Sequence, residues 1–232
     1  MTDHDWRRQL AAGARGLGLE LSPKQLEQFS CYLEELRRWN RAYNLTRIIA
    51  PEAVARGHFL DSLNYLPGLD ESACDPVLDL GTGPGFPGLP LALVRPESEF
   101  LLCESRGKKT LFLEHLIGLL KLDNVTIINL HLSRQNAKTV IRRPVSAVVC
   151  RAVNLLRDVV PVAAELLSEQ GVLLFTEAAP ESGGIRRKLE QNWPGLCLSR
   201  MEKCLLPGRA PDLYLGRITR RPGHTPKETQ AN

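Results

Sequence analysis

Residues 77–88 read Val-Leu-Asp-Leu-Gly-Thr-Gly-Pro-Gly-Phe-Pro-Gly. The stretch starts as a short apolar run and has four glycines in its last eight positions. This pattern predicts a buried strand that leads through a tight loop into a helix. Gly81, Gly83 and Gly85 permit backbone angles that other residues resist, and they leave no Cβ between the backbone and a ligand. Amides at the start of the following helix would face that ligand.

Two acidic residues accompany apolar runs in this region. Asp79 stands near the end of the first run, and Glu104 directly follows the run Phe100–Cys103. Because the carboxyl ends of parallel strands meet at one edge of a sheet, both carboxylates would face the same ligand. The pattern Gly83-x-Gly85-x-x-Gly88 matches the dinucleotide fingerprint, but a carboxylate beside the loop would repel a pyrophosphate. Two acids suit hydroxyls and an ammonium group, which favours S-adenosylmethionine as the cofactor.

The composition is that of a soluble globular protein. The 232 residues are 43% hydrophobic and 24% charged, and the formal net charge of +4 permits an anionic partner without requiring one. The six cysteines form no Cys-x-x-Cys pair, so we expect no metal site and no disulfide framework, as in a reducing cytoplasm. The polar start and the absence of an apolar run near ~20 residues predict neither a signal peptide nor a membrane span.

Residues 1–75 predict a helical segment. Apolar residues recur at helical spacing from Trp6 to Leu19, and Ser22-Pro23-Lys24-Gln25 combines an N-cap, a proline at the first position and a capping-box glutamine. A third helix is expected from Pro51 to about Leu66, ended by Pro67-Gly68. We interpret this segment as a cap on the rest of the chain rather than an independent catalytic unit.

From Pro76 onwards, short apolar runs alternate with helical patterns, which is typical of a parallel sheet. Expected strands cover 76–80, 99–104, 125–130, 146–150 and 171–177, and expected helices cover 87–94, 108–121, 154–168 and 182–191. Two further runs, 196–206 and 212–219, are joined by a link too short for a crossover and predict an antiparallel final pair. The pattern therefore predicts an α/β fold over 76–219. A parallel sheet that ends in an antiparallel pair is, by analogy, common in Rossmann-like methyltransferases that use S-adenosylmethionine. Residues 220–232 are expected to form a disordered tail.

Five motifs together resemble the bacterial RsmG family, also called GidB. They are Trp39-Asn40-Arg41-Ala42-Tyr43-Asn44-Leu45-Thr46, His58-Phe59-Leu60-Asp61-Ser62-Leu63, Asp79-Leu80-Gly81-Thr82-Gly83-Pro84-Gly85-Phe86-Pro87-Gly88-Leu89-Pro90-Leu91, Glu104-Ser105-Arg106-Gly107-Lys108-Lys109 and Arg151-Ala152. The resemblance runs in register from about residue 20 to 219. It implies an S-adenosylmethionine-dependent methyltransferase that modifies guanine N7 at nucleotide 527, in the 530 loop of 16S rRNA. The partner would be 16S rRNA or the small ribosomal subunit, and the protein is expected to be a monomer.

The resemblance also implies roles for single residues. The cofactor-binding set would be Asp79, Gly81, Thr82, Gly83, Gly85, Phe86, Glu104, Leu132 and Ser133. Arg151 would be the catalytic residue that faces the target base, and Lys108 and Lys109 would join it in contacting RNA. The motif residues that would pack the helical segment over the cofactor pocket are Asn44, Thr46, His58 and Asp61.

The sequence lacks motifs that other kinds of base methylation use, which agrees with methyl transfer to guanine N7. Guanine N7 carries an in-plane lone pair and no proton, so methyl transfer to it rests on alignment and electrostatics without a general base. The sequence contains neither the Asn-Pro-Pro-Tyr type of motif used on amino groups of bases nor a Pro-Cys nucleophile for C5 methylation. An arginine at position 151 could hydrogen-bond guanine O6 or clamp a phosphate. From its position alone it could equally form a salt bridge.

The sequence departs from the family pattern after the third and fifth strands. His131 and Ser133 stand where the family commonly has an arginine and a glutamate, and Glu177-Ala178 replaces a common Lys-Gly. A carboxylate beside an RNA pocket would repel phosphate. Three alternatives therefore stay open: a small-molecule methyltransferase, a non-catalytic RNA-binding relative and, disfavoured by Asp79, a nicotinamide dehydrogenase.

His58 and Asp61, three residues apart, could also be an acid–base pair.

Overall fold

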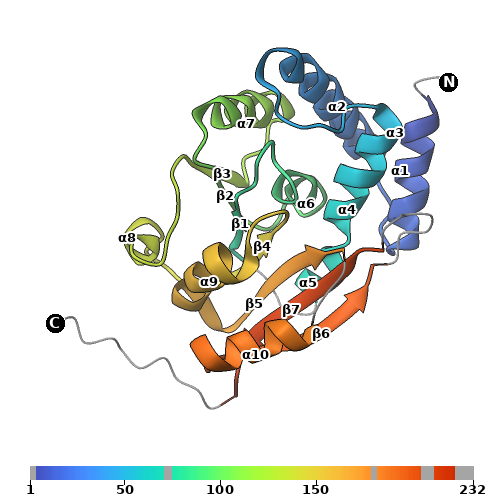
Figure 1. The fold of residues 1–232 in the computed structure, drawn as a ribbon. Helices are drawn as coiled ribbons and strands as arrows, with labels where there is room; N and C mark the ends of the chain where they lie inside the picture. The colour runs from blue at the N-terminus through green and yellow to red at the C-terminus, as the bar shows by residue number, and fades with distance from the viewer. Residues whose placement is uncertain (1–3, 71–74, 179–181, 205–211, 223–232) are drawn as a thin grey trace.

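The computed structural model describes residues 4–70, 75–178, 182–204 and 212–222, and within them the strands form one seven-stranded sheet in the order β3-β2-β1-β4-β5-β7-β6 (Figure 1). The strands are β1 Val77–Leu80, β2 Phe100–Cys103, β3 Val125–Ile128, β4 Val145–Cys150, β5 Leu167–Glu177, β6 Leu196–Lys203 and β7 Tyr214–Arg220. β1 lies between β2 and β4, and the pairings from β3 across to β5 are all parallel. β7 pairs antiparallel with both β5 and β6. The predicted α/β fold with an antiparallel final pair is confirmed.

Helices cover both faces of the sheet. They are α1 His4–Gly16, α2 Pro23–Tyr43, α3 Pro51–Val54, α4 Asp61–Leu63, α5 Leu66–Asp70, α6 Gly88–Val94, α7 Gly107–Leu120, α8 Ala137–Val140, α9 Val160–Leu166 and α10 Ser182–Asn192, with the π-helical turns η1 Ala55–Leu60 and η2 Leu155–Val159. None of the helices in the described residues is long and apolar enough to cross a membrane.

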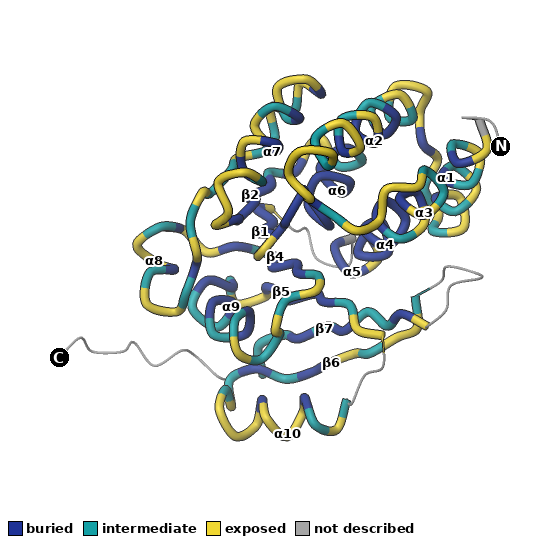
Figure 2. Tube along the Cα trace, turned by 45° about the horizontal axis from the view of Figure 1, so that its top comes forward, coloured by how far each residue is buried: buried dark blue, intermediate teal, exposed yellow. Residues whose placement is uncertain are grey.

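The alternation of side chains along each strand divides the core into two layers. Val149 and Leu174 contribute to one layer, where Phe29 of α2 and Phe112 of α7 are fully buried. Val148 lies in the other layer, which packs against α9 and α10. Figure 2 shows the buried central strands of the sheet, among them β1 and β2, between the two sets of helices. The N-terminal helices thus share one hydrophobic core with the sheet, while the domain boundary expected at residue 75 stays a prediction.

The predicted start of α2 is confirmed in atomic detail. The Ser22 hydroxyl accepts a hydrogen bond from the Gln25 amide at 3.2 Å, and the Gln25 side chain accepts one from the Ser22 amide at 2.9 Å. These two bonds satisfy amide donors that the first turn of a helix leaves without partners. At the other end, Asn44 adopts a left-handed conformation with φ 49° and donates its amide to the Asn40 carbonyl. The chain therefore turns sharply at Asn44, one residue after α2.

The prediction for the third helix was wrong in two respects. The helical path over 51–63 is interrupted by the wider turn η1, and Pro67 and Gly68 lie inside a further helix, α5. A proline is compatible with the first turn of a helix, where its missing N–H is not needed. A Cβ on Gly68 would lie 2.8 Å from the Leu174 side chain, so glycine lets α5 approach β5 closely.

Other boundaries also differ from the expectation. The helix expected over 154–168 is divided into η2 and α9, and residues 167–168 already belong to β5. The third strand ends at Ile128 rather than at residue 130, and the short helix α8 was not predicted. The link 207–211 and most of the expected tail lie outside the described residues, although Arg220 still belongs to β7.

Candidate functional site

The loop after β1 forms as the glycine pattern predicts. Gly81, Gly83 and Gly85 have φ values of 73°, 61° and 108°, a region that favours glycine. The Gly81 and Thr82 amides donate to the Cys103 carbonyl of β2 at 2.9 and 3.0 Å, which fixes the loop to the neighbouring strand. A Cβ on Gly85 would collide with the Tyr32 hydroxyl and the Leu89 side chain. The loop is therefore compact and built into the core.

Asp79 is fully buried beside this loop. Its Oδ2 accepts a hydrogen bond from the Gly88 amide, at the start of α6, at 2.7 Å. Burial raises the pKa of Asp79 to about 7, although the Thr82 hydroxyl and the Gly88 amide act in the opposite direction. Its Oδ1 and the buried Thr82 Oγ1 make no hydrogen bond of good geometry within the described part of the chain, although the Thr82 hydroxyl is close enough to the carboxylate to lower its pKa. The Asp79 carboxylate thus has acceptor capacity left for a donor of a ligand.

Glu104 is buried at the end of β2, next to a cation. Its Oε1 accepts a hydrogen bond from the Arg106 amide at 2.8 Å, and its Oε2 lies 3.7 Å from Lys109 Nζ. A Cβ on Gly83 would lie 3.6 Å from the same ammonium group. Lys109 therefore points over the glycine loop, whereas the neighbouring Lys108 is exposed and stands 5.7 Å above the Tyr43 ring.

A small cavity of about 70 Å³ opens at the ends of β1, β2 and β3. Gly81, Glu104 and Leu132 line it, together with Val153 from the loop after β4. Leu132 is 5% exposed, whereas Ser133 lies just outside the cavity and its amide donates to the Asn136 side chain. The cavity thus brings together residues from three of the predicted cofactor-binding motifs.

A larger cavity of about 390 Å³ lies beside the first, between the ends of β4 and β5. Its walls include Val153, Leu156 and Phe175, and Glu177 and Ala178 stand at the end of β5. Val153 lines both cavities, so they are neighbours along the carboxyl edge of the sheet. This is the edge where open α/β sheets bind their ligands.

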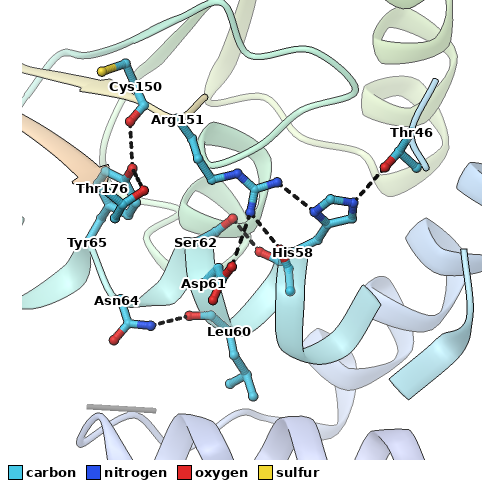
Figure 3. Close-up of polar contacts among 11 residues, drawn as sticks. Thr46, His58, Leu60, Asp61, Ser62, Asn64, Tyr65, Cys150, Arg151 and Thr176 are labelled. Atoms are coloured by element: carbon cyan, nitrogen blue, oxygen red, sulfur yellow. Dashed lines mark hydrogen bonds and ion pairs between the residues drawn. The ribbon is translucent and has the colours of Figure 1, made fainter. Parts of the chain in front are cut away.

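Arg151 follows β4 directly and is held by the helical segment (Figure 3). Its Nη1 donates to the Gly57 carbonyl at 2.9 Å and lies 3.8 Å from Asp61 Oδ2, and its Nη2 lies 2.6 Å from His58 Nδ1. The guanidinium carbon is 5.3 Å from the centre of the Phe86 ring. These contacts join Arg151 to η1, α4 and the glycine loop at the edge of the sheet. Only 17% of its side chain is exposed.

His58 is a neutral link in this network. Burial, with the neighbouring Arg151 charge, lowers its pKa to about 3. Because arginine has no acceptor, Nδ1 must accept from Arg151, and Nε2 then carries the proton and donates to Thr46 Oγ1 at 2.9 Å. The imidazole also stacks on Phe86, with ring centres 4.3 Å apart. The residues expected to pack the helical segment over the pocket are thus connected to Arg151.

The effect of pH on stability provides a test of this network. In the unfolded chain His58 binds a proton near pH 6.5, but in the folded chain it does so only near pH 3, so its stabilising contribution is present above pH 6.5 and declines as pH falls. We expect His58→Gln to lower the free energy of unfolding at pH 8 by about 2 kcal/mol more than it does at pH 5. Urea unfolding of both proteins at the two pH values measures this difference. His131→Gln, at an exposed position, should show no such change, and a pH-independent difference for His58→Gln would contradict the assignment.

Two tyrosines of the site are absent from the sequence-based prediction. Tyr32 of α2 donates to the Pro84 carbonyl at 2.6 Å and stacks on Phe86 with ring centres 5.2 Å apart. Tyr65 donates to the Cys150 carbonyl at 2.6 Å and lies 3.0 Å from the Thr176 hydroxyl. Both fix the carboxyl edge from the helical side. Their place in apolar helical patterns indicates burial, but nothing local indicates the distant carbonyl partners.

Fold and site define a class of protein: a Rossmann-like α/β protein with cavities at the carboxyl edge of its sheet. The solved structure of the glycopeptide N-methyltransferase MtfA, complexed with S-adenosylmethionine, matches with a TM-score of 0.54 and 12% identity over 69% of this chain and 93% of that chain. At this identity the match concerns the fold alone. No cluster of three or more metal-ligating side chains occurs in the described ranges.

The particular family follows from sequence relatives. The family model of rRNA small subunit methyltransferase G, GidB, matches residues 25–192. Ribosomal RNA small subunit methyltransferase G of Cellvibrio japonicus is 36% identical over 189 residues, which cover 78% of this chain and 84% of that protein. Its counterpart in Ectopseudomonas mendocina is 41% identical over 150 residues, covering 65% and 68%. The chain belongs to this family of rRNA methyltransferases.

Proposed function

We propose that this chain transfers a methyl group from S-adenosylmethionine to N7 of guanine 527 in 16S rRNA. The observation that carries the proposal is the pair of neighbouring cavities along the carboxyl edge, one lined by the buried Glu104 and the other at the end of the strand that Arg151 follows. Membership in the rRNA small subunit methyltransferase G family supports rRNA as the substrate. We expect the reaction to take place in the cytoplasm, with the protein acting as a monomer.

The residues of the smaller cavity fit the cofactor. Glu104 offers a buried carboxylate to ribose hydroxyls, and Leu132 offers an apolar wall to the adenine. Asp79 does not line this cavity, but it is buried just before Leu80 and Gly81, which do, and its Oδ1 has acceptor capacity that suits the ammonium group of an amino-acid tail. The glycines of the loop leave the backbone open to close approach. When bound, S-adenosylmethionine supplies an electrophilic methyl group on a sulfonium.

The larger cavity fits an acceptor base. Its volume of about 390 Å³ lies within the range of ligand pockets, and Val153, Leu156 and Phe175 provide apolar surface for a flat ring. Glu177 at its border disfavours a phosphate, but its carboxylate can accept hydrogen bonds from N1–H and N2–H of guanine. The departure from the common lysine is thus compatible with a guanine at this position.

Arg151 would act by positioning the base rather than by proton transfer. Guanine N7 has no proton to lose, and the transfer moves positive charge from the sulfonium to the guanine, so the chain needs to hold the base in line with the methyl group. A hydrogen bond from Arg151 to guanine O6 would do this. The contacts to Gly57, His58 and Asp61 fix the guanidinium at the end of β4. His58 cannot act as a general base for a proton that is absent, which favours a positioning role for the His58–Asp61 pair over the acid–base alternative.

Transfer of label tests the proposal. The protein is incubated with methyl-labelled S-adenosylmethionine and small ribosomal subunits from a strain that lacks the modification, and 16S rRNA is then isolated. We expect label in the RNA, and much less with subunits that are already modified. Cofactor binding measured by calorimetry without any label in RNA would reject the proposal in favour of a non-methylating relative. Label in a small molecule of a cell extract, but not in RNA, would favour a small-molecule methyltransferase.

A further inference from the structure

An exposed apolar cluster borders the candidate site. Among the described residues, the exposed large apolar side chains are Tyr43, Ile48, Ile49, Leu111 and Leu119. The first three belong to the end of α2 and the segment that joins it to α3, which Figure 2 shows as an exposed stretch. Leu111 lies one turn after Lys108 on α7, and Lys108 contacts the Tyr43 ring. Tyr43 and Leu111 therefore lie beside the contact between α2 and α7, and Ile48 and Ile49 follow in the segment after α2.

The same junction is rich in cations. Residues 37–50 contain four arginines and no acid, and the start of α7 adds Arg106, Lys108 and Lys109. Arg38 is paired with Glu35, and Lys109 lies near Glu104. The cations without an ion pair to any residue that the structure describes are Arg37, Arg41, Arg47, Arg106 and Lys108, and all five are exposed. Positive charge thus surrounds the apolar side chains.

Direct contacts connect this surface to the candidate site. A Cβ on Gly57 would lie 3.5 Å from Ile48, and the Gly57 carbonyl accepts the hydrogen bond from Arg151. Thr46 Oγ1 accepts from the Ile48 amide at 3.2 Å and lies 2.9 Å from His58. Lys109, next to Lys108 in the chain, contacts the glycine loop. A molecule bound on this surface would therefore lie directly beside the glycine loop and Arg151.

We propose that this surface, formed by residues 43–49 and the first two turns of α7, binds an unpaired segment of the substrate rRNA adjacent to the target nucleotide. Bases would stack on Tyr43 and pack against Ile48 and Ile49, while Arg47, Arg106 and Lys108 contact phosphates. Aromatic and aliphatic surface flanked by cations is the chemistry that recognises single-stranded RNA, because unstacked bases present flat apolar faces and each nucleotide carries a charge. The proposal rests on the proposed function.

Binding of RNA, measured without methyl transfer, tests the surface. Fluorescence anisotropy gives the Kd for a single-stranded RNA oligonucleotide and for a duplex of the same sequence. We expect Tyr43→Ala to weaken binding of the single strand about tenfold or more, and Tyr43→Phe to restore it, because the ring provides the stacking surface. Lys108→Ala should reduce the slope of log K against log salt by about 1. Leu119→Ala, 47% exposed on α7 but outside the surface, should bind like wild type.

Three results separate the alternatives. Equal losses in Tyr43→Ala and Leu119→Ala, or no loss in either, would overturn the proposal. A higher KM of Tyr43→Ala for small subunits with unchanged binding of bare RNA would also overturn it, since the surface would then contact a ribosomal protein. If the wild type binds the single strand through Tyr43 but transfers no methyl group, the surface is supported and the proposed function fails. Calorimetry with S-adenosylmethionine should give the same cofactor Kd for every variant.

Discussion

Arg151→Ala is expected to lower the turnover number for methyl transfer at least ~100-fold, with the Kd for S-adenosylmethionine changed only a few-fold. The reason is its position: the guanidinium stands beside Phe86 at the end of β4, and Arg151 lies between Cys150 and Ala152, which both line the larger cavity. The same variant should be less stable, because the Asp61 carboxylate, 2% exposed, loses its Arg151 partner. Removing one partner of a buried ion pair costs about 3 to 5 kcal/mol of unfolding free energy.

The loss of activity must be separated from the loss of stability. Arg151→Ala combined with Asp61→Asn removes both charges, and we expect it to recover most of the unfolding free energy but not the methyl transfer. Urea unfolding and single-turnover kinetics on the three proteins measure the two effects. Arg15→Ala, which removes a surface salt bridge with Glu20, serves as the control and should change neither. Recovery of transfer in the double variant would mean that Arg151 has only a structural role.

Asp79→Asn is the second substitution with a large expected effect. An asparagine can still accept the hydrogen bond from the Gly88 amide, so the loop should keep its shape. The asparagine cannot neutralise the ammonium group of the cofactor. Loss of one partner from a buried, hydrogen-bonded charge pair typically costs about 2 to 5 kcal/mol of binding free energy. We therefore expect the Kd for S-adenosylmethionine to rise at least ~30-fold, since 1.4 kcal/mol corresponds to a factor of ten.

The effect of pH on cofactor binding identifies Asp79 more directly. Burial holds its pKa at about 7 in the free protein, so a proton and the cofactor's ammonium group compete for the carboxylate near neutrality. Affinity should rise as the pH is raised through 7 in wild type and stay constant in Asp79→Asn. Calorimetry between pH 6 and pH 8.5 measures both, with Glu114→Gln, an exposed acid on α7, as the control. An unchanged Kd in Asp79→Asn would mean that the carboxylate only orders the loop.

Local patterns were sufficient to predict much of this fold. The run at 77–88 and the capping box at Ser22 each depend on residues that are close together in the sequence, and both have the predicted structure. The interruptions at η1 and η2 were missed because a π-helical turn differs from an α-helix by a single hydrogen-bond shift, which side-chain periodicity does not detect. Pro67-Gly68 resembled a helix stop because the close approach of α5 to Leu174 is a tertiary requirement.

The candidate site was only partly predictable for the same reason. Asp79 and Glu104 could be brought together because strand ends share an edge in any parallel sheet. The partners of Arg151 could not be derived, since Gly57 and His58 are more than ninety residues away and their contact depends on how η1 crosses the sheet edge. Lys109 illustrates a further limit: the sequence places it beside Lys108, but the helix turns one toward Glu104 and the other toward Tyr43.

The identity of the methylated atom is the central claim, and one measurement tests it most directly. After reaction with small subunits that lack the modification, 16S rRNA is digested and each labelled fragment is analysed by mass spectrometry. The account predicts one new 7-methylguanosine, at nucleotide 527, in reactions with wild type, and its formation at least ~100-fold more slowly in reactions with Arg151→Ala. A methyl group on another atom or another nucleotide, or the same product from Arg151→Ala at the wild-type rate, would contradict it.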